Sequence, residues 1–340
     1  MKKAHGSQQG EFTSSRRSTF WSDLTSSRTP FFALAPMDDV TDLVFRQLVA
    51  ELAPADVYFT EFASVEGFCS AGKHAVERRL RLADGEQSVV AQIWGTTPEK
   101  YRQTAIELST RGFVGIDINM GCPVRDVIKT GACSGLIRTP ELAAEIITAT
   151  KAGAGDLPVS VKTRLGFDKP DIDGWLGFLL KQDIAALTVH LRTVKEQSKV
   201  DAHWEAVDEI IALRDKLAPH TVLIFNGDIK DRADGFNKVV GKNNVGLMIG
   251  RGIFHNPWTF EIEAREHTCD ERIVALLRHL ELFEQTWAEE EKRFEPLKRF
   301  FKIYIQGFDG AAEMRNALMT CHDIEQARVV LRSQNKSLDI

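Results

Sequence analysis

Residues 115–135, GIDINMGCPVRDVIKTGACSG, join a short apolar strand to a loop that contains glycine, proline and cysteine. The apolar run that ends at Ile118 is typical of a parallel strand covered on both faces. Gly121 and Pro123 end this strand and force a loop. Cys122 therefore follows the carboxyl end of a parallel strand, where α/β enzymes hold their reactive groups. Taken alone, the cysteine favours a buried thiol in a tight turn, and the pattern of the whole chain reverses this preference.

The sequence on either side repeats this alternation of strand and helix. Eight strands are predicted, at Phe31–Ala35, Val57–Thr60, Val89–Trp94, Val114–Ile118, Val159–Lys162, Ala186–His190, Val222–Phe225 and Val245–Ile249. Amphipathic helices are predicted between most of them, at Asp42–Leu52, Pro98–Arg111, Pro140–Lys151, Ile172–Gln182, Trp204–Lys216 and Lys230–Val239. Eight such units predict an α/β fold of the (β/α)8 TIM-barrel class. A doubly wound open sheet is the alternative, which the lack of an early GxGxxG disfavours.

The residue composition and the spacing of apolar residues change at both ends of this repeat. Residues 1–29 are rich in Ser, Thr and basic residues and predict a disordered arm. From about residue 270 the strand patterns stop, and apolar residues recur at helical spacing. We therefore expect a barrel domain at 30–268 and a small C-terminal bundle of three to four helices at 269–340.

Composition excludes several classes of protein. The net charge is −5, so any binding of nucleic acid needs a local basic patch. The five cysteines are odd in number and form no CxxC pair, which argues against a disulfide framework and a structural zinc site. No apolar run is long enough to cross a membrane, and no secretory signal is recognisable. We expect a cytoplasmic monomer without a metal site or a membrane contact.

In a barrel of this class, chemistry belongs at the carboxyl ends of the strands. The polar or loop-forming residues at those ends are Pro36, Met37, Glu61, Gln92, Asn119, Cys122, Lys162, Arg164 and His190. A lysine at the end of an apolar strand needs a partner, because an unpaired buried charge is costly. Lys162 therefore predicts an anion or a polar ligand at this end of the barrel.

Two glycine-containing turns follow the last two strands. Asn226-Gly227-Asp228 follows the seventh strand, and Gly250-Arg251-Gly252 follows the eighth. This is the usual phosphate site of the barrel class, where small residues let backbone N–H groups close on the oxyanion. A short helix starting near Gly252 is expected to add its positive end, and Arg251 its charge. Since the chain has no Walker motif, the phosphate is expected to belong to a cofactor.

A basic run lies in the expected bundle. It contains Lys292, Arg293, Lys298, Arg299 and Lys302, with Glu291 and Glu295 between them. At spacings near three and four these residues share a helix face. The run fits a solvated surface or a contact with nucleic acid.

These motifs resemble the tRNA-dihydrouridine synthase family, in order and at fitting spacing. The resemblance rests on Ala35–Met37, Asp117–Pro123, Val161–Gly166, Val189–Thr193, Asn226–Asp228 and Met248–Gly252, and it covers roughly residues 31–305. It implies an FMN-bearing barrel followed by a small helical domain that helps to hold tRNA. It also implies that NADPH reduces the flavin, and that a uridine of the tRNA is reduced at its 5,6 double bond.

The resemblance implies a role for each strand-end residue. Cys122 is expected to protonate carbon 5 of the uracil while hydride goes to carbon 6. The expected FMN contacts are Pro36, Met37, Gln92, Lys162, His190, Asn226, Gly227, Asp228, Gly250 and Arg251. The expected substrate contacts are Asn119 and Arg164 at the base, with Lys298 and Arg299 on the tRNA backbone.

Two positions depart from the family pattern. Leu191 stands where relatives more often have a small residue, and Cys133 lies where many have no thiol. Cys133, like Cys69, Cys269 and Cys321, is expected to serve packing alone. Two other functions stay open: an FMN barrel acting on a small molecule, such as a dihydroorotate- or dihydropyrimidine-type oxidoreductase, and a non-catalytic RNA-binding protein.

Overall fold

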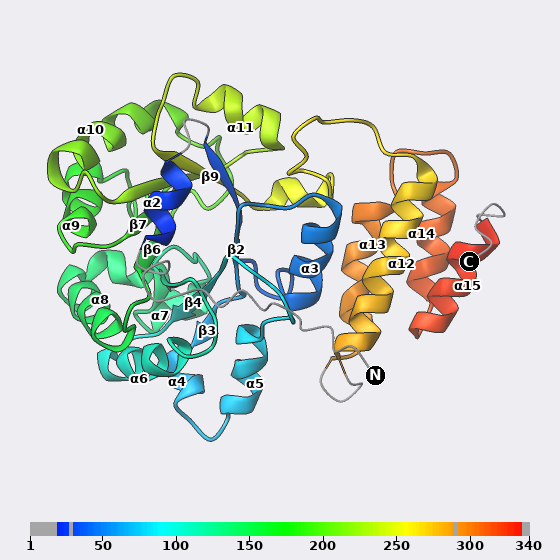
Figure 1. The fold of residues 1–340 in the computed structure, drawn as a ribbon, viewed down its shortest axis with the longest axis horizontal. Coiled ribbons are helices and arrows are strands. Elements are labelled where there is room, and N and C mark those ends of the chain that lie inside the picture. Colours follow the sequence, from blue (N-terminus) through cyan, green and yellow to red (C-terminus); the bar gives the residue numbers. More distant parts are fainter. Residues whose placement is uncertain (1–18, 27–29, 288–291, 335–340) are drawn as a thin grey trace, which may run out of the picture.

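The computed structural model describes residues 19–26, 30–287 and 292–334. Within them, parallel strands form one sheet in the order β2-β1-β9-β8-β7-β6-β5-β4-β3. Their bounds are β1 Phe31–Leu34, β2 Val57–Phe59, β3 Ala63–Ser64, β4 Val89–Trp94, β5 Gly115–Asn119, β6 Val159–Arg164, β7 Ala186–His190, β8 Val222–Asn226 and β9 Val245–Ile249. Strand β2 also pairs with β4, which closes the sheet. Because β2 and β3 share one place beside β4, the sheet is an eight-position TIM barrel, and the open-sheet alternative is excluded (Figure 1).

Helices surround the barrel, as the sequence predicts (Figure 1). They are α3 Leu43–Leu52, α4 Val65–Phe68, α5 Lys73–Glu77, α6 Pro98–Leu108, α7 Arg125–Lys129, α8 Pro140–Gly153, α9 Gly177–Leu180, α10 Val207–Leu217 and α11 Arg232–Lys238. The segment around Gly72 is broken into α4 and α5, which agrees with the weak helical pattern there. The predicted helix at 172–182 starts as a π-helical turn, Ile172–Leu176, and continues as α9.

The interior of the barrel changes character along its axis. Alternate residues of a strand point inward, and most of the inward residues of the first half of the strands are apolar. They form a cluster that includes Phe31, Ala33, Phe59, Val90, Ala186, Val222 and Ile224. Continuing the same alternation toward the carboxyl ends gives Gln92, Asn119, Lys162, His190 and Asn226. The polar layer of the barrel is therefore confined to its carboxyl end.

A short helix, α2 (Phe20–Thr25), covers the apolar end of the barrel. Phe20 and Trp21 are buried in the interior cluster, and the Trp21 ring centroid lies 6.2 Å from that of Phe31 and 6.4 Å from that of Phe59. The expected disordered arm is therefore wrong for residues 20–25, because two aromatic side chains gain burial inside the barrel. The rest of that arm, residues 1–18 and 27–29, lies outside the described residues.

Trp21→Ala is expected to lower the free energy of unfolding by about 3–5 kcal/mol, the usual cost of truncating a buried aromatic side chain. Chemical denaturation measures this change. Ser22→Ala, one position along α2 on an exposed side chain, is the matched control and should change stability by less than about 0.5 kcal/mol. Equal stability of the two variants would show that α2 does not seal the barrel.

The C-terminal part of the described chain is helical. It contains α12 Cys269–Thr286, a 3₁₀ turn Glu295–Leu297, α13 Lys298–Tyr304, α14 Ala311–Thr320 and α15 Ile324–Gln334. Thr268 and Glu271 form a capping box that starts α12. Figure 1 shows α12 and α13, in yellow and orange, on the α3 side of the barrel. The prediction of a helical bundle after the barrel is confirmed.

The bundle packs on α3 through an aromatic cluster with ion pairs beside it. The ring centroid of Phe45 lies 5.2 Å from that of Phe300 and 5.9 Å from that of His279. Arg278 donates two hydrogen bonds to Glu51, at 2.7 and 2.8 Å. These contacts fix α13 close to the loop that follows β1.

All five cysteines are free thiols, as their number and spacing predict. Among the described helices, none combines the length and the apolar character that crossing a membrane needs.

Candidate active site

Strand register brings the predicted polar residues into one layer. Asn119 of β5 pairs with Lys162 of β6, and His190 of β7 pairs with Asn226 of β8. Arg164 lies opposite His190. Because all strands are parallel, their carboxyl ends meet at one mouth. Residues that are far apart in sequence therefore share a site there.

A hydrogen-bonded chain of buried side chains orients the loop after β5. Ser160 Oγ donates to Asp117 Oδ1 at 2.6 Å, and Gln92 Nε2 donates to Asp117 Oδ2 at 2.7 Å. Asn119 Nδ2 donates to Gln92 Oε1 at 2.9 Å. Asn119 Oδ1 then accepts hydrogen bonds from the backbone N–H groups of residues 121 and 122, at 3.1 and 3.0 Å. Asn119 thus fixes the cysteine-bearing loop.

Asp117 is the charged centre of this chain, and the sequence analysis did not single it out. Burial raises its pKa to about 6, against the hydrogen bonds from Ser160 and Gln92 and the charge of Lys162. Gln92, predicted to contact the cofactor, is fully buried and has both ends of its amide engaged with Asp117 and Asn119. Its position supports Asn119 and does not line the neighbouring cavity.

Cys122 lies half-buried on the loop that Asn119 holds. Interaction with the thiol of Cys133 lowers the pKa of Cys122 to about 7, against the effect of burial. The backbone N–H of Val124 and the charge of Arg164 act in the same direction as Cys133. A thiol with a pKa near neutrality can both give and regain a proton at physiological pH.

Cys133 begins the 3₁₀ segment that follows α7. It is fully buried, but its thiol interacts with that of Cys122, and this interaction together with burial raises the pKa of Cys133 well above its ordinary value. Ser134 Oγ also donates to the backbone oxygen of Cys122, at 2.7 Å. The loop after α7 thus folds back onto the cysteine loop, and the interpretation of Cys133 as packing alone stays a prediction.

Arg164 supports the same loop from β6. Its Nε donates to the oxygen of Gly121 at 2.8 Å, and its Nη1 donates to the oxygens of Thr193 and Gln197. Burial lowers the pKa of Arg164 to about 10, which leaves it charged at neutral pH. This charge lies near Cys122 and favours its thiolate form.

A cavity of about 620 Å³ opens beside this loop, within the size range of small-molecule and cofactor sites. Except for Gln92, every residue predicted to bind the cofactor lines it: Pro36, Met37, Lys162, His190, Asn226, Gly227, Asp228, Gly250 and Arg251. The lining of this one cavity thus combines residues at the ends of β1, β6, β7, β8 and β9. Lys162 links the two parts of the site, since it lines the cavity and its charge acts on Cys122.

The cavity carries positive charge around a neutral imidazole. Burial and the neighbouring cation Arg164 lower the pKa of Lys162 to about 8, so its ammonium is mostly charged at pH 7. Burial, Arg164 and Lys162 lower the pKa of His190 well below its usual range. Buried His190 Nδ1 has no hydrogen-bond partner in the described structure. A buried polar atom without a partner, next to two cations, indicates a site for a polar ligand.

The loops after β8 and β9 pack tightly against each other. A Cβ atom on Gly252 would lie 2.5 Å from the oxygen of Ile229 and 2.7 Å from that of Lys230, so only glycine fits. Gly227 has φ +135°, which also favours glycine. The expected short helix is a single 3₁₀ turn, Arg251–Phe254, too short for a helix dipole. Backbone N–H groups and Arg251 remain at these loops as candidate donors to an anion.

Asp228 and Leu191 have structural roles in these loops. Asp228 accepts hydrogen bonds from Arg192 and from the backbone N–H of Ala202, and Arg251 lies 3.7 Å from its other oxygen. Leu191 is fully buried in the outer core, while its backbone pairs with Asn226 and His203. The bulky residue that departs from the family pattern therefore points away from the mouth.

The basic run divides into buried and exposed members. Lys298 Nζ donates to the oxygen of Met319 at 3.0 Å and pairs with Glu295, and its side chain is only 11% exposed. Lys292 pairs with Asp42, the cap of α3, at 2.6 Å. Arg299 is 43% exposed and lies against the oxygen of Asp39, at the edge of the mouth. Lys298, predicted to contact tRNA, is thus engaged inside the bundle, whereas Arg299, Arg293 and Lys302 face outward.

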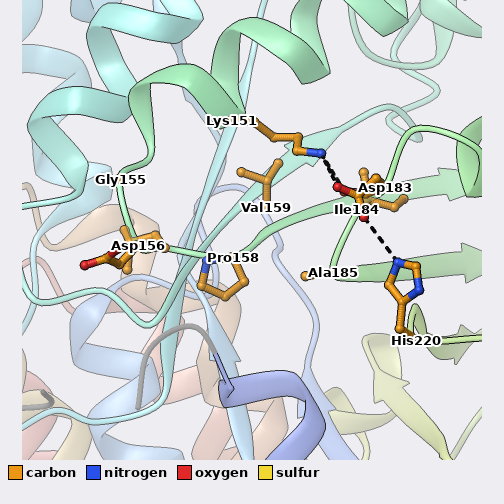
Figure 2. Close-up of a pocket in the computed structure, with 10 residues that line it drawn as sticks. Lys151, Gly155, Asp156, Pro158, Val159, Asp183, Ile184, Ala185 and His220 are labelled. Atoms are coloured by element: carbon orange, nitrogen blue, oxygen red, sulfur yellow. Dashed lines mark hydrogen bonds and ion pairs between the residues drawn. The ribbon is translucent and has the colours of Figure 1, made fainter. Parts of the chain in front are cut away.

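A second cavity, of about 420 Å³, lies at the opposite end of the barrel. Its lining includes Pro158 and Val159 at the start of β6 and Ala185 before β7. Figure 2 shows Lys151 and His220 turned toward Asp183, with which both pair. Lys151 and His220 are therefore already paired with Asp183. The mouth that carries Cys122 remains the candidate site.

Comparison with known proteins agrees with this geometry. Residues 33–338 match the family model described as "Dihydrouridine synthase (Dus)". A "Probable tRNA-dihydrouridine synthase" of Staphylococcus aureus (strain MRSA252) is 52% identical over 325 residues, which cover 95% of this chain and 98% of the relative. A "Probable tRNA-dihydrouridine synthase 2" of Bacillus subtilis (strain 168) is 50% identical over 323 residues, covering 94% and 98%. The chain therefore belongs to the dihydrouridine synthase family.

Proposed function

We propose that this protein is a tRNA-dihydrouridine synthase that reduces the 5,6 double bond of a uridine in tRNA, with FMN as cofactor and NADPH as reductant. The observation that carries the proposal is the shared mouth: Cys122 and the cationic cavity open at the same end of the barrel, with Lys162 between them. Relatives that are 50–52% identical over nearly their whole length carry the same name.

The residues of the cavity fit a flavin phosphate and ring. Asn226, Gly227, Gly250 and Arg251 would hold the phosphate, because their loops offer backbone N–H groups and a guanidinium where a side chain at Gly252 has no room. Pro36, Met37, Lys162 and His190 would hold the ring, and His190 Nδ1 would gain a partner there. When bound and reduced by NADPH, FMN supplies the hydride for carbon 6 of the uracil.

On the other face of the uracil, residues of the protein donate the proton. Cys122 would give its proton to carbon 5, which lowers the barrier because an isolated uracil double bond is a poor electrophile. Asn119 holds the loop of Cys122 through two backbone N–H groups, and Arg164 holds the oxygen of Gly121. The thiolate left on Cys122 would be stabilised by the charge of Arg164.

We further propose that residues 30–268 form the FMN-binding catalytic domain and residues 269–340 a helical domain for tRNA. The exposed Arg299 of α13 lies beside Asp39 in the loop after β1, so a strand of tRNA can reach from α13 to the mouth. A uridine stacked inside folded tRNA cannot reach Cys122, and the base must therefore be flipped out.

Arg251→Ala is expected to weaken FMN binding about ten- to a hundredfold, since a hydrogen bond to a charged group contributes roughly 1.5–3 kcal/mol. Titration of the apoprotein with FMN, followed by flavin fluorescence, measures the dissociation constant. Lys216→Ala removes an exposed cation from α10, outside the cavity, and should leave the dissociation constant unchanged. Unchanged affinity in Arg251→Ala would refute the phosphate assignment.

Mass spectrometry of tRNA tests the proposed function in the cell. Deletion of the gene should remove dihydrouridine from a defined tRNA position, and the parent gene should restore it. A small-molecule oxidoreductase would leave tRNA unchanged, although it would also purify with flavin absorbance. A non-catalytic RNA-binding protein would lack that absorbance altogether.

A further inference from the structure

Three side chains in register on neighbouring strands form a buried row inside the barrel. Ser160 of β6 is paired with Asp117 of β5, and Asp117 is paired with Gln92 of β4. The three residues are 1%, 0% and 0% exposed. Asp117 stands in the middle of the row and accepts a hydrogen bond from each neighbour, Ser160 on one side and Gln92 on the other.

The hydrogen bonds that continue from this row have only one possible direction. An ionised carboxylate only accepts, so Gln92 turns its Nε2 toward Asp117 and its Oε1 toward Asn119. Asn119 then donates through Nδ2 and keeps Oδ1 for the backbone N–H groups of residues 121 and 122, which only donate. Turning either amide round would set donor against donor and acceptor against acceptor. The carboxylate thus fixes the orientation of both amides.

The surroundings of Asp117 show what a carboxylate contributes at this position. Both of its oxygens accept from neutral groups, and the cation Lys162, whose charge acts on Asp117, donates to Asn226 Oδ1 at 3.4 Å. Asp117 does not line the neighbouring cavity. Burying a carboxylate is costly, whereas an apolar side chain would fill the barrel interior without that cost. What an apolar side chain cannot supply is an acceptor for Gln92.

We propose that Asp117 is a positioning residue that, through Gln92 and Asn119, holds the backbone of residues 121 and 122 and with it the place of Cys122. The hold on the loop is a property of the fold. Its consequence for proton transfer rests on the proposed function, in which Cys122 is the proton donor.

The test is hydrogen–deuterium exchange of the full-length protein as purified, resolved to the amides of residues 121 and 122 by mass spectrometry with electron-transfer fragmentation. Asp117→Ala removes the acceptor, so exchange at these two amides should be several-fold to about tenfold faster, the effect of losing one hydrogen bond. The amides of β8, in the same barrel, should keep their parent rates. Gln92→Met interrupts the row at the next residue and should have the same effect, which keeps the test valid if Asp117→Ala folds poorly.

Two matched variants separate the proposed role from packing and from charge. Asp117→Asn keeps an oxygen that can accept from Gln92, while its amide N–H can donate to Ser160, so exchange at 121 and 122 should stay near the parent rate. Ser160→Ala removes a hydrogen bond to the same carboxylate on the side away from Asn119, and should also leave these amides at the parent rate.

Four results would overturn the proposal. Parent-like exchange at 121 and 122 in both Asp117→Ala and Gln92→Met would show that the row does not hold the loop. Acceleration that extends equally to β8, or that Ser160→Ala reproduces, would assign the effect to general packing. An Asp117→Asn variant as fast as Asp117→Ala would assign it to charge.

The catalytic consequence is measured separately. Single-turnover reoxidation of the NADPH-reduced enzyme by tRNA should slow roughly ten- to a hundredfold in Asp117→Ala, since displacing a reacting group by about 1 Å can cost about a hundredfold. Asp117→Asn should recover most of the rate. Exchange needs no tRNA turnover, so the two failures are distinguishable: a parent that forms no dihydrouridine refutes the function, whereas unchanged exchange refutes the role of Asp117.

Discussion

Cys122→Ala is expected to bind FMN and to be reduced by NADPH like the parent, yet to form dihydrouridine roughly two to four orders of magnitude more slowly, the usual contribution of a general acid. Neither cofactor binding nor reduction uses the thiol, since Cys122 does not line the cavity that would hold FMN. The rate to measure is the single-turnover reoxidation of the NADPH-reduced enzyme by unmodified tRNA.

Cys269→Ala is the matched control, because Cys269 is also a half-buried free thiol but starts α12, away from the mouth. Cys133→Ala is a poorer control, since Cys133 contributes to the lowered pKa of Cys122. With a pKa of about 7, Cys122 is protonated below neutral pH, so the parent rate should fall as pH rises above 7. Near-normal reoxidation in Cys122→Ala would show that another group delivers the proton.

The second large effect concerns tRNA capture. Arg299 and Lys302 are exposed neighbours three residues apart on α13, and Arg299 lies at the edge of the mouth. Replacing both by Ala should weaken tRNA binding roughly tenfold or more at low salt and reduce the slope of log K against log salt by about two. Fluorescence anisotropy of labelled tRNA at several salt concentrations measures both quantities.

Lys298→Ala separates surface charge from internal packing. The Lys298 ammonium is bound to Met319 and Glu295 inside the bundle, so its loss should lower thermal stability and leave the salt slope near that of the parent. The role of α13 in binding tRNA is refuted if the Arg299 and Lys302 double variant keeps the parent slope. NADPH oxidation by the flavin should be the same in all these variants.

The barrel was predictable because its strands are short apolar runs and its helices are periodic. Each of the eight predicted strands is present, and the polar residues at their ends meet because parallel register places them in one layer. Helix α2 was missed since its two aromatic residues stand in a Ser- and Thr-rich segment, and their burial depends on a barrel that forms later in the chain.

The remaining differences depend on tertiary contacts that no local pattern records. Ser134 is twelve residues from Cys122, and only the fold of the intervening loop and α7 brings its hydroxyl to the backbone oxygen of Cys122. Lys298 and Arg299 are adjacent in sequence, yet one faces the bundle and the other faces the mouth. Asp117 did carry a usable signal, since an acid inside an apolar strand needs hydrogen-bond partners.

The most direct test incubates the purified protein with NADPH and tRNA transcribed without modifications, and follows the tRNA by mass spectrometry. The account predicts the addition of two hydrogens to a single uridine in the parent reaction and almost no addition with Cys122→Ala in the same time, although both proteins oxidise NADPH. Unmodified tRNA after complete turnover of the parent, with the flavin bound and reduced, would contradict the assignment of this barrel to uridine reduction.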